Sequence, residues 1–259
     1  MKIRPVTFFS PIPTITPSDP EPPAKANMLV WYRGDSLQDS GGTATAWNDK
    51  TGNGINLSTY GNPTVTDAAD MNNRRVAHLS ETGGDRPYFG ADASPSTLFP
   101  LTSALTLIVV CQLDFSTTAV QQLPIFCLRT TAGLQSLFFK SDYTWTYQYL
   151  RQFSTEKELL DVWGGTDLDR RLPRGILSTI TTAPSRTIYH NNILVDSTSQ
   201  SVNLGLTADA ITIGSEMFGD TWNDRGNTNI AEVILYNKAL DSTERGQFWS
   251  YLDGYYGIS

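Results

Sequence analysis

The clearest hydrophobic pattern lies in the last thirty residues of the chain. Residues 230–236 are β-branched and apolar, which predicts a strand buried on both faces. Asp241 or Ser242 then stands where a helix N-cap belongs, and Glu244 completes a capping box with Asp241. Aromatic and apolar residues recur at helical spacing after this cap, at Phe248, Trp249, Leu252, Tyr255 and Tyr256. The pattern therefore predicts a strand followed by a short C-terminal helix that ends near Gly257.

Shorter apolar runs earlier in the chain predict further strands. Residues 105–114 are the most apolar segment and predict a central strand, and residues 123–130 and 134–141 predict a hairpin. A second hairpin is expected to turn at Asn191 and Asn192, because asparagine tolerates the left-handed conformations that tight turns require. Residues 155–163, which open with Thr155 and carry Glu158, match a second capped helix.

Strict alternation over residues 142–153 predicts one long strand. It places Tyr143, Trp145, Tyr147 and Tyr149 on the same face of that strand. Such a row can be a sugar-stacking platform on an exposed sheet face, or it can fill the core between two sheets. The pattern alone leaves both interpretations open.

Composition favours a single all-β domain. Charged residues make up only 17% of the 259 residues, and the apolar runs are short and bounded by turn residues. Cys111 and Cys127 both lie within apolar runs, which predicts buried reduced thiols, or a disulfide if the two strands are neighbours. We expect a sandwich or a barrel.

The first 26 residues differ from the rest of the chain. Seven of the fourteen prolines lie in the first 23 positions, which favours an extended arm. Such an arm is either a disordered linker or a segment that docks on a partner. Docking is the hypothesis we follow, because the arm carries apolar residues that suit an anchor: Val6, Phe8, Phe9, Ile12 and Ile15. The domain organisation is therefore an anchoring arm over residues 1–26 and a globular domain over residues 27–259.

Charge and hydropathy exclude several partners. The formal net charge is −7, and the basic residues are scattered, so we expect no nucleic-acid partner. Nowhere do eighteen apolar residues run together, so we expect no membrane span, and the N-terminus lacks the apolar region of an export signal.

Three segments in order carry a family resemblance: LVWYRGDS with AWNDKTGNG, TIYHNNILV with ITIGS, and IAEVILYNKALDSTERGQFWSYLDGYYGI. Together they resemble the concanavalin A-like lectin/glucanase superfamily, and specifically its laminin-G-like modules, over residues 28–259. The resemblance implies a jelly-roll sandwich of two antiparallel sheets with a short C-terminal helix. It also implies a setting, because the closing segment is typical of modules in bacteriophage virion proteins and bacterial surface proteins. The region of residues 150–175 departs from the family pattern as an insertion.

Catalytic chemistry is not expected. The glycosidases of this superfamily carry closely spaced acidic residues on one strand, and this chain has no such motif. An acidic cluster at Glu156, Glu158 and Asp161 is interpreted as the solvated face of the predicted helix. His78 and His190 have no nucleophile motif beside them and are assigned structural roles. We predict no catalytic residue, no metal ligand and no cofactor, with a structural calcium ion left open.

Candidate ligand-binding residues come from the aromatic row and from a polar loop. The row contributes Tyr143, Trp145 and Tyr147. The loop over residues 219–229 mixes aromatic and polar groups in the manner of a recognition loop, with an ordinary turn as the alternative, and contributes Asp220, Trp222, Asp224 and Arg225.

Two functions follow from this sequence. The first is a structural protein of a bacteriophage particle, as a capsid decoration protein or as part of the tail fibre or baseplate. The arm would anchor it to other virion proteins, and we expect it in many copies or as a homo-oligomer. The second is a carbohydrate-binding module that recognises host-surface glycans, and a glycoside hydrolase is a distant third. A lectin-type fold without an export signal favours the virion, because a virion protein leaves the cell by lysis.

Overall fold

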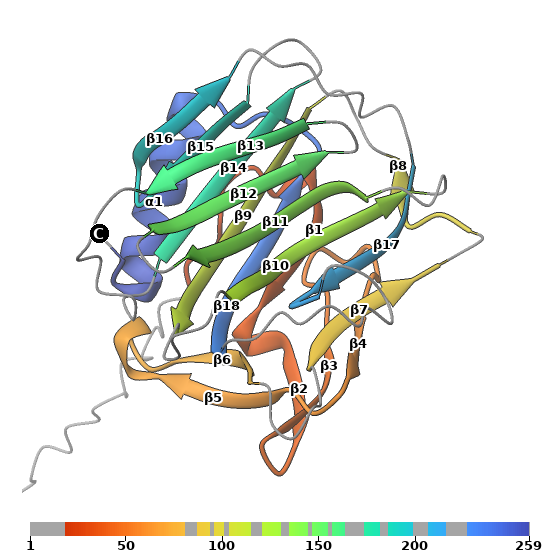
Figure 1. Ribbon diagram of the computed structural model, residues 1–259. Helices are drawn as coiled ribbons and strands as arrows, with labels where there is room; N and C mark the ends of the chain where they lie inside the picture. Colours follow the sequence, from red (N-terminus) through yellow and green to blue (C-terminus); the bar gives the residue numbers. More distant parts are fainter. Residues whose placement is uncertain are drawn as a thin grey trace, which may run out of the picture.

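A computed structural model describes residues 19–80, 87–93, 96–100, 104–114, 121–130, 135–144, 147–154, 157–163, 174–181, 186–198, 207–215 and 227–258 (Figure 1). In these ranges most residues lie in antiparallel strands, with α1 (Ser242–Tyr256) as the α-helix of the described part. Three short 3-10 turns accompany the strands: η1 (Lys25–Asn27), η2 (Gly34–Ser36) and η3 (Ala69–Met71). No helix in the described ranges is long and apolar enough to cross a membrane.

The first of two facing sheets is built around the C-terminal strand. Its order is β1 (Met28–Arg33), β18 (Asn227–Tyr236), β9 (Ala104–Asp114), β14 (Arg174–Thr181), β15 (Arg186–His190) and β16 (Ile193–Thr198). Beside β1, the start of β18 also pairs with β6 (Arg74–Leu79), which continues to β5 (Thr64–Ala68). The apolar segment at residues 105–114 is therefore a central strand, as predicted.

The second sheet lies in front of the first in Figure 1. Its order is β2 (Leu37–Ser40), β3 (Thr43–Trp47), β4 (Leu57–Tyr60), β7 (Tyr88–Asp92), β17 (Thr207–Ile213), β10 (Gln121–Thr130), β11 (Gln135–Thr144), β12 (Tyr147–Ser154) and β13 (Lys157–Trp163). The short strand β8 (Phe99–Pro100) pairs with β17 next to β7. The arrangement is the predicted all-β sandwich of two antiparallel sheets.

Helix α1 packs on the outer face of the first sheet and creates a second buried layer. Successive side chains of a strand point to opposite faces. On β9, Val109 therefore packs between the sheets, whereas Ile108 packs toward the helix. On β18, Val233 and Ile234 divide in the same way. Because both faces of these strands are covered, their sequences are continuously apolar instead of alternating.

The C-terminal helix begins and ends as its sequence predicts. The Asp241 side chain accepts a hydrogen bond from the backbone N–H of Glu244, and the Glu244 carboxylate accepts one from the backbone N–H of Asp241. Gly257 ends the helix at φ 69°, a left-handed conformation that glycine adopts without a side-chain clash. The hairpin turn at Asn191 and Asn192 is confirmed by φ values of 42° and 64°.

Two predicted elements are wrong. Residues 157–163 form strand β13 instead of a helix, because pairing with β12 satisfies their backbone groups in a sheet. Residues 142–153 are not one strand, because β11 ends at Thr144 and β12 begins at Tyr147, with these two residues paired directly. Local propensity and alternation were overridden by strand pairing in both places.

Cys111 and Cys127 are buried and unbonded to each other, as the sequence favoured. Cys111 lies on β9 in the first sheet, and Cys127 lies on β10 in the second. His78 has a structural role, because its Nδ1 atom lies 2.7 Å from Oδ1 of Asn229 on the neighbouring strand. The side chain of His190 lies outside the described part.

Candidate functional site

A buried carboxyl group lies between strand β18 and helix α1. Glu232 has no exposed surface. Its Oε1 atom accepts a hydrogen bond of 2.5 Å from Nε1 of Trp31, and the Tyr251 hydroxyl lies 2.8 Å from each of its two oxygens. Burial raises the pKa of Glu232 to about 7, although these hydrogen bonds and the charge of Arg33 act in the opposite direction. Helix α1 covers the carboxyl group of Glu232. The hydrogen bonds of this carboxyl therefore tie the helix to β1 and β18, and the group is not accessible to a substrate.

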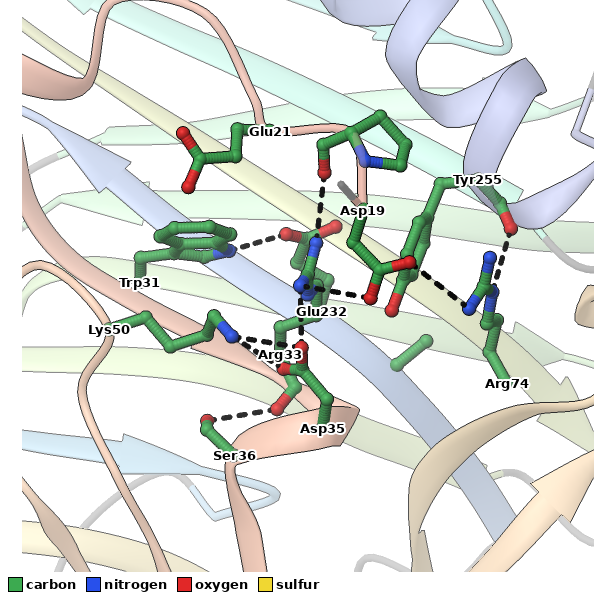
Figure 2. Close-up of polar contacts among 12 residues, drawn as sticks. Asp19, Glu21, Trp31, Arg33, Asp35, Ser36, Lys50, Arg74, Glu232 and Tyr255 are labelled. Carbon is green, nitrogen blue, oxygen red and sulfur yellow. Dashed lines mark hydrogen bonds and ion pairs between the residues drawn. The ribbon is translucent and has the colours of Figure 1, made fainter. Parts of the chain in front are cut away.

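The guanidinium of Arg33 lies beside this carboxyl, between two aromatic rings (Figure 2). Its Cζ atom lies 5.1 Å from the ring centroid of Trp31 and 4.5 Å from that of Tyr255, distances suited to cation–π attraction. Nη2 donates to Asp35 at 2.5 Å. Arg33 is only 3% exposed, and its Nε has no hydrogen-bond partner among the described residues.

Further cations surround this pair of rings. Arg74 lies against Tyr255, with its Cζ 3.8 Å from the ring centroid, and its Nε donates to the backbone carbonyl of Tyr255 at 3.1 Å. Lys50 lies 5.2 Å from the Trp31 centroid and donates to both oxygens of Asp35, at 2.9 and 2.8 Å. We call this group the Arg33 cluster, and it consists of Trp31, Arg33, Asp35, Lys50, Arg74 and Tyr255.

Asp35 is the one acidic residue of the Arg33 cluster, and the neighbouring positive charges keep it ionised. Burial alone would raise the pKa of Asp35, but hydrogen bonds from Arg33 and Lys50 hold that pKa below its ordinary value. Asp35 therefore remains a carboxylate that orients both cations. Loop residues beside β1 support this arrangement, because Oδ1 of Asp49 accepts from the backbone N–H of Trp31 at 3.0 Å.

The segment of residues 19–24 lies over the Arg33 cluster. The Pro20 carbonyl accepts from Nη1 of Arg33 at 3.0 Å, and the Pro23 carbonyl accepts from the Tyr236 hydroxyl at 3.0 Å. Asp19 lies 3.8 Å from both Arg33 and Arg74, through one carboxylate oxygen each. This end of the predicted arm is thus held on the sandwich. The predicted anchoring residues Val6, Phe8, Phe9, Ile12 and Ile15 lie outside the described part.

A second feature is an aromatic pair on the second sheet, with one exposed ring and one half-buried ring. Tyr60 on β4 and Tyr88 on β7 are cross-strand partners, and their rings stack with centroids 4.5 Å apart and an interplanar angle of 5°. Tyr60 is 38% exposed. Phe89 points into the core between the sheets, so Tyr88 and Asp92 face outward on the same strand. We call Tyr60 and Tyr88 the tyrosine platform.

The ligand-binding residues predicted from the sequence are only partly placed. Tyr143 is on β11 and pairs with Gln148, whereas Tyr147 is on β12 and pairs with Thr144, so the predicted single-strand row does not exist. Trp145 lies outside the described part, as do Asp220, Trp222, Asp224 and Arg225 in the loop. Their roles in binding stay predictions. Within the described ranges, no group of acidic, histidine and cysteine residues has the arrangement of a metal site.

Sequence reasoning missed the Arg33 cluster and the tyrosine platform. A usable signal for the first was Glu232, a lone charged residue inside the apolar run of residues 230–236. A charge placed in a strand buried on both faces needs partners, and this alone predicts a buried polar network nearby. No comparable signal marked Tyr60 and Tyr88, because their pairing depends on strands that are distant in sequence.

The geometry defines a fold class: a jelly-roll β-sandwich of two antiparallel sheets with a C-terminal helix on one of them. No family model matches the chain. No curated protein matches its sequence.

Solved structures of botulinum neurotoxin binding domains share this fold. One is botulinum neurotoxin type C, reported as dependent on interaction with two ganglioside molecules for cell entry, with a TM-score of 0.62 and 12% identity. A second is the binding domain of botulinum neurotoxin DC in complex with SialylT, with a TM-score of 0.62 and 11% identity. A third is the binding domain of the same toxin in complex with rat synaptotagmin II, with a TM-score of 0.59 and 12% identity. Each match covers 88% of this chain and 52% of the other, so the chain spans about half the length of these structures.

Proposed function

We propose that this chain is a carbohydrate-binding module that recognises glycans through the tyrosine platform. The fold supports a binding role, because similar sandwiches belong to binding domains, one of them from a toxin that interacts with gangliosides. Fold alone does not assign a ligand. The observation that carries the proposal is the parallel stacking of the exposed Tyr60 ring on the half-buried Tyr88 ring at the outer face of the second sheet.

The tyrosine platform suits the surface of a sugar ring. Aromatic faces carry partial negative charge, and they attract the weakly positive C–H groups of a pyranose. Stacking on Tyr88 holds the Tyr60 ring in one orientation, so little conformational entropy is lost when a sugar packs against it. Ser58 is exposed on the same outer face and supplies a hydroxyl for sugar hydroxyls, and further along β7 the Asp92 carboxylate accepts from Arg129 at 2.8 Å. This arrangement binds a glycan without altering it.

A glycan array with matched variants tests this proposal. Tyr60→Ala removes the ring and is expected to weaken binding by about tenfold, whereas Tyr60→Phe keeps the ring and is expected to bind within about threefold of wild type. Leu194→Ala is the control, because Leu194 is 50% exposed on a different sheet. Trp145→Ala and Trp222→Ala test the two sites predicted from sequence. A blank array, or equal binding by wild type and Tyr60→Ala, would overturn the proposal.

A virion structural role is a second proposal, in which residues 1–18 anchor the sandwich to other virion proteins. The observation that favours it is the attachment of residues 19–24 at Arg33 and Tyr236, which fixes the point where an anchor would leave the domain. Deletion of residues 1–18 keeps those contacts and isolates the anchor. Sedimentation of the truncated and full chains, alone and with particles, is expected to show loss of assembly. Unchanged assembly would contradict the anchor.

A further inference from the structure

We infer that the Arg33 cluster is a carboxylate-binding site, occupied here by residues 19–21 of the same chain, and that its external ligand is a carboxylated sugar. The inference rests on the proposed glycan-binding function but uses a different surface from the tyrosine platform. It follows from three properties of the described contacts: a guanidinium fixed in place, a carboxylate position between two arginines, and a weakly held occupant (Figure 2).

The first property is the rigidity of Arg33. Its guanidinium lies between the rings of Trp31 and Tyr255 and is held by Asp35 through Nη2. Nη1 donates to the Pro20 carbonyl, and Nε has no partner in the described part of the chain. A ligand that displaces Pro20 has to give Nη1 a new acceptor, and a carboxylate oxygen does so. An arginine that is already fixed loses little side-chain entropy when it binds one.

The second property is the position of the Asp19 carboxylate. One of its oxygens lies 3.8 Å from Nη2 of Arg33, and the other lies 3.8 Å from Nη1 of Arg74. Both distances are too long for hydrogen bonds. A carboxylate therefore fits between the two arginines. The Asp19 carboxylate, however, lies farther from them than the distance of about 2.8 Å that charge-assisted hydrogen bonds prefer. A free ligand has no such tether and can approach both guanidinium groups closely.

The third property is the weak attachment of the occupant. Pro20, Pro22 and Pro23 lack backbone N–H groups, so this segment cannot pair as a strand with the sandwich. The Asp19 side chain is 53% exposed, and it lies 3.8 Å from each arginine, so its two ion pairs are long and open to solvent on the Asp19 side. Residues 19–21 are exposed, whereas Pro22 is buried and keeps the segment attached. A carboxylate that replaces the Pro20 carbonyl at Arg33 can therefore displace residues 19–21 alone and reach both arginines.

The ligand class follows from the size and charge of this position. Two arginines facing one carboxylate match a single acidic group, and the net charge of −7 disfavours a polyanion. Trp31 and Tyr255 are buried, so they hold the arginine and do not stack on a sugar themselves. A uronic or sialic acid thus presents its carboxylate to the arginines while its ring remains at the surface.

Paired sugars and paired variants test the site in the full chain. The probes are methyl glucuronide and methyl glucoside, which differ only at the carboxylate, followed by NMR chemical-shift titration. Asp19→Asn removes the charge of the occupant and is expected to raise glucuronide affinity by about threefold, whereas Arg74→Gln lowers it by a similar factor. Asp253→Asn, an exposed acid on α1, makes the same change in net charge and is expected to bind as wild type does. Added salt should weaken glucuronide binding alone.

The outcomes separate this site from the tyrosine platform. Equal affinity of Asp19→Asn and Asp253→Asn for glucuronide would overturn the inference, as would equal binding of the two sugars. Array binding that depends on Tyr60 and is indifferent to Asp19→Asn would overturn this inference and support the proposed function. If glucuronide binding depends on Asp19 and Arg74 but the glycan array shows no binding, this site is supported and the proposed role of the tyrosine platform is overturned. Melting temperatures of the variants confirm that each one is folded.

Discussion

The layer between the two sheets and the layer between the first sheet and helix α1 are both buried, but different interactions hold them together. The first is filled by carbon-rich side chains such as Trp47, Phe89 and Phe126. The second also contains Glu232, whose carboxyl receives Trp31 and Tyr251. Hydrophobic packing has little directional preference, whereas hydrogen bonds to a buried group require one orientation. The comparison indicates that apolar packing stabilises both layers, and that the buried polar group of the second layer also fixes where the helix sits.

The largest expected effect comes from removing a tryptophan from either layer. Trp47→Ala is expected to lower the free energy of unfolding by about 5 kcal/mol, because the ring is fully buried and its Nε1 donates to the Arg33 carbonyl. Trp249→Ala in the helix layer is expected to lower it by about 3 kcal/mol, because that ring is 7% exposed and its Nε1 has no partner among the described residues. Chemical denaturation measures both.

Leu194→Ala is the control for this pair, because exposed positions usually change stability by less than about 0.5 kcal/mol. If Trp249→Ala were as mild as the control, the helix would contribute little to the fold, and the proposed role of the second layer would be wrong.

The next effect is a pH dependence that belongs to the second layer alone. The pKa of Glu232 is raised by burial from 4.5 to about 7, so the folded state binds a proton that the unfolded state releases. This contribution to stability is fully present below about pH 4.5 and is lost as the pH rises to about 7, for a total of about 3 kcal/mol. Glu232→Gln cannot titrate and should lack this loss.

Denaturation curves of wild type and Glu232→Gln between pH 4.5 and 8 measure the difference. Other titrating groups are common to both proteins and cancel in the subtraction. We expect the advantage of wild type over the variant to shrink as the pH rises. Parallel pH profiles would contradict a titrating carboxyl in the second layer.

The smallest effect concerns the link from this layer to the N-terminal segment. Tyr236→Phe removes the hydroxyl that donates to the Pro23 carbonyl and is expected to lower stability by about 1 kcal/mol. The same change should increase proteolytic cleavage near residues 19–24, because one of the described attachments of that segment is lost. Thr106→Val is the control, because it removes a hydroxyl that donates to the Lys238 carbonyl and accepts from the Leu240 N–H, neither of which belongs to the N-terminal segment. Cleavage that rises equally in both variants would show a general loss of stability instead.

Sequence patterns predicted the elements that local interactions define. The capping box of Asp241 and Glu244 and the turn at Asn191 and Asn192 depend on residues within a few positions of each other, and both were predicted correctly. The helix expected at residues 155–163 was wrong because β12 supplies partners that no local pattern reveals. Alternation over residues 142–153 likewise gave no sign of the reversal between Thr144 and Tyr147.

The candidate sites were the least predictable part of the molecule. Trp31 and Glu232 are separated by 201 residues in the sequence and meet only because β1 pairs with β18. Tyr60 and Tyr88 meet because β4 pairs with β7. The aromatic residues chosen from the sequence shared an alternation, which is a property of one strand, whereas a binding site gathers residues from several strands.

The sequence by itself determined the class of the fold and the way the chain ends. Apolar runs bounded by turn residues favour a sandwich or a barrel, and the capped aromatic helix needs a sheet face to cover. Only the tertiary structure decided that Glu232 faces this helix, that Arg33 lies between Trp31 and Tyr255, and that residues 19–24 cover the cluster. The physical reason is that burial and charge pairing depend on contacts between distant segments, and strand register sets those contacts.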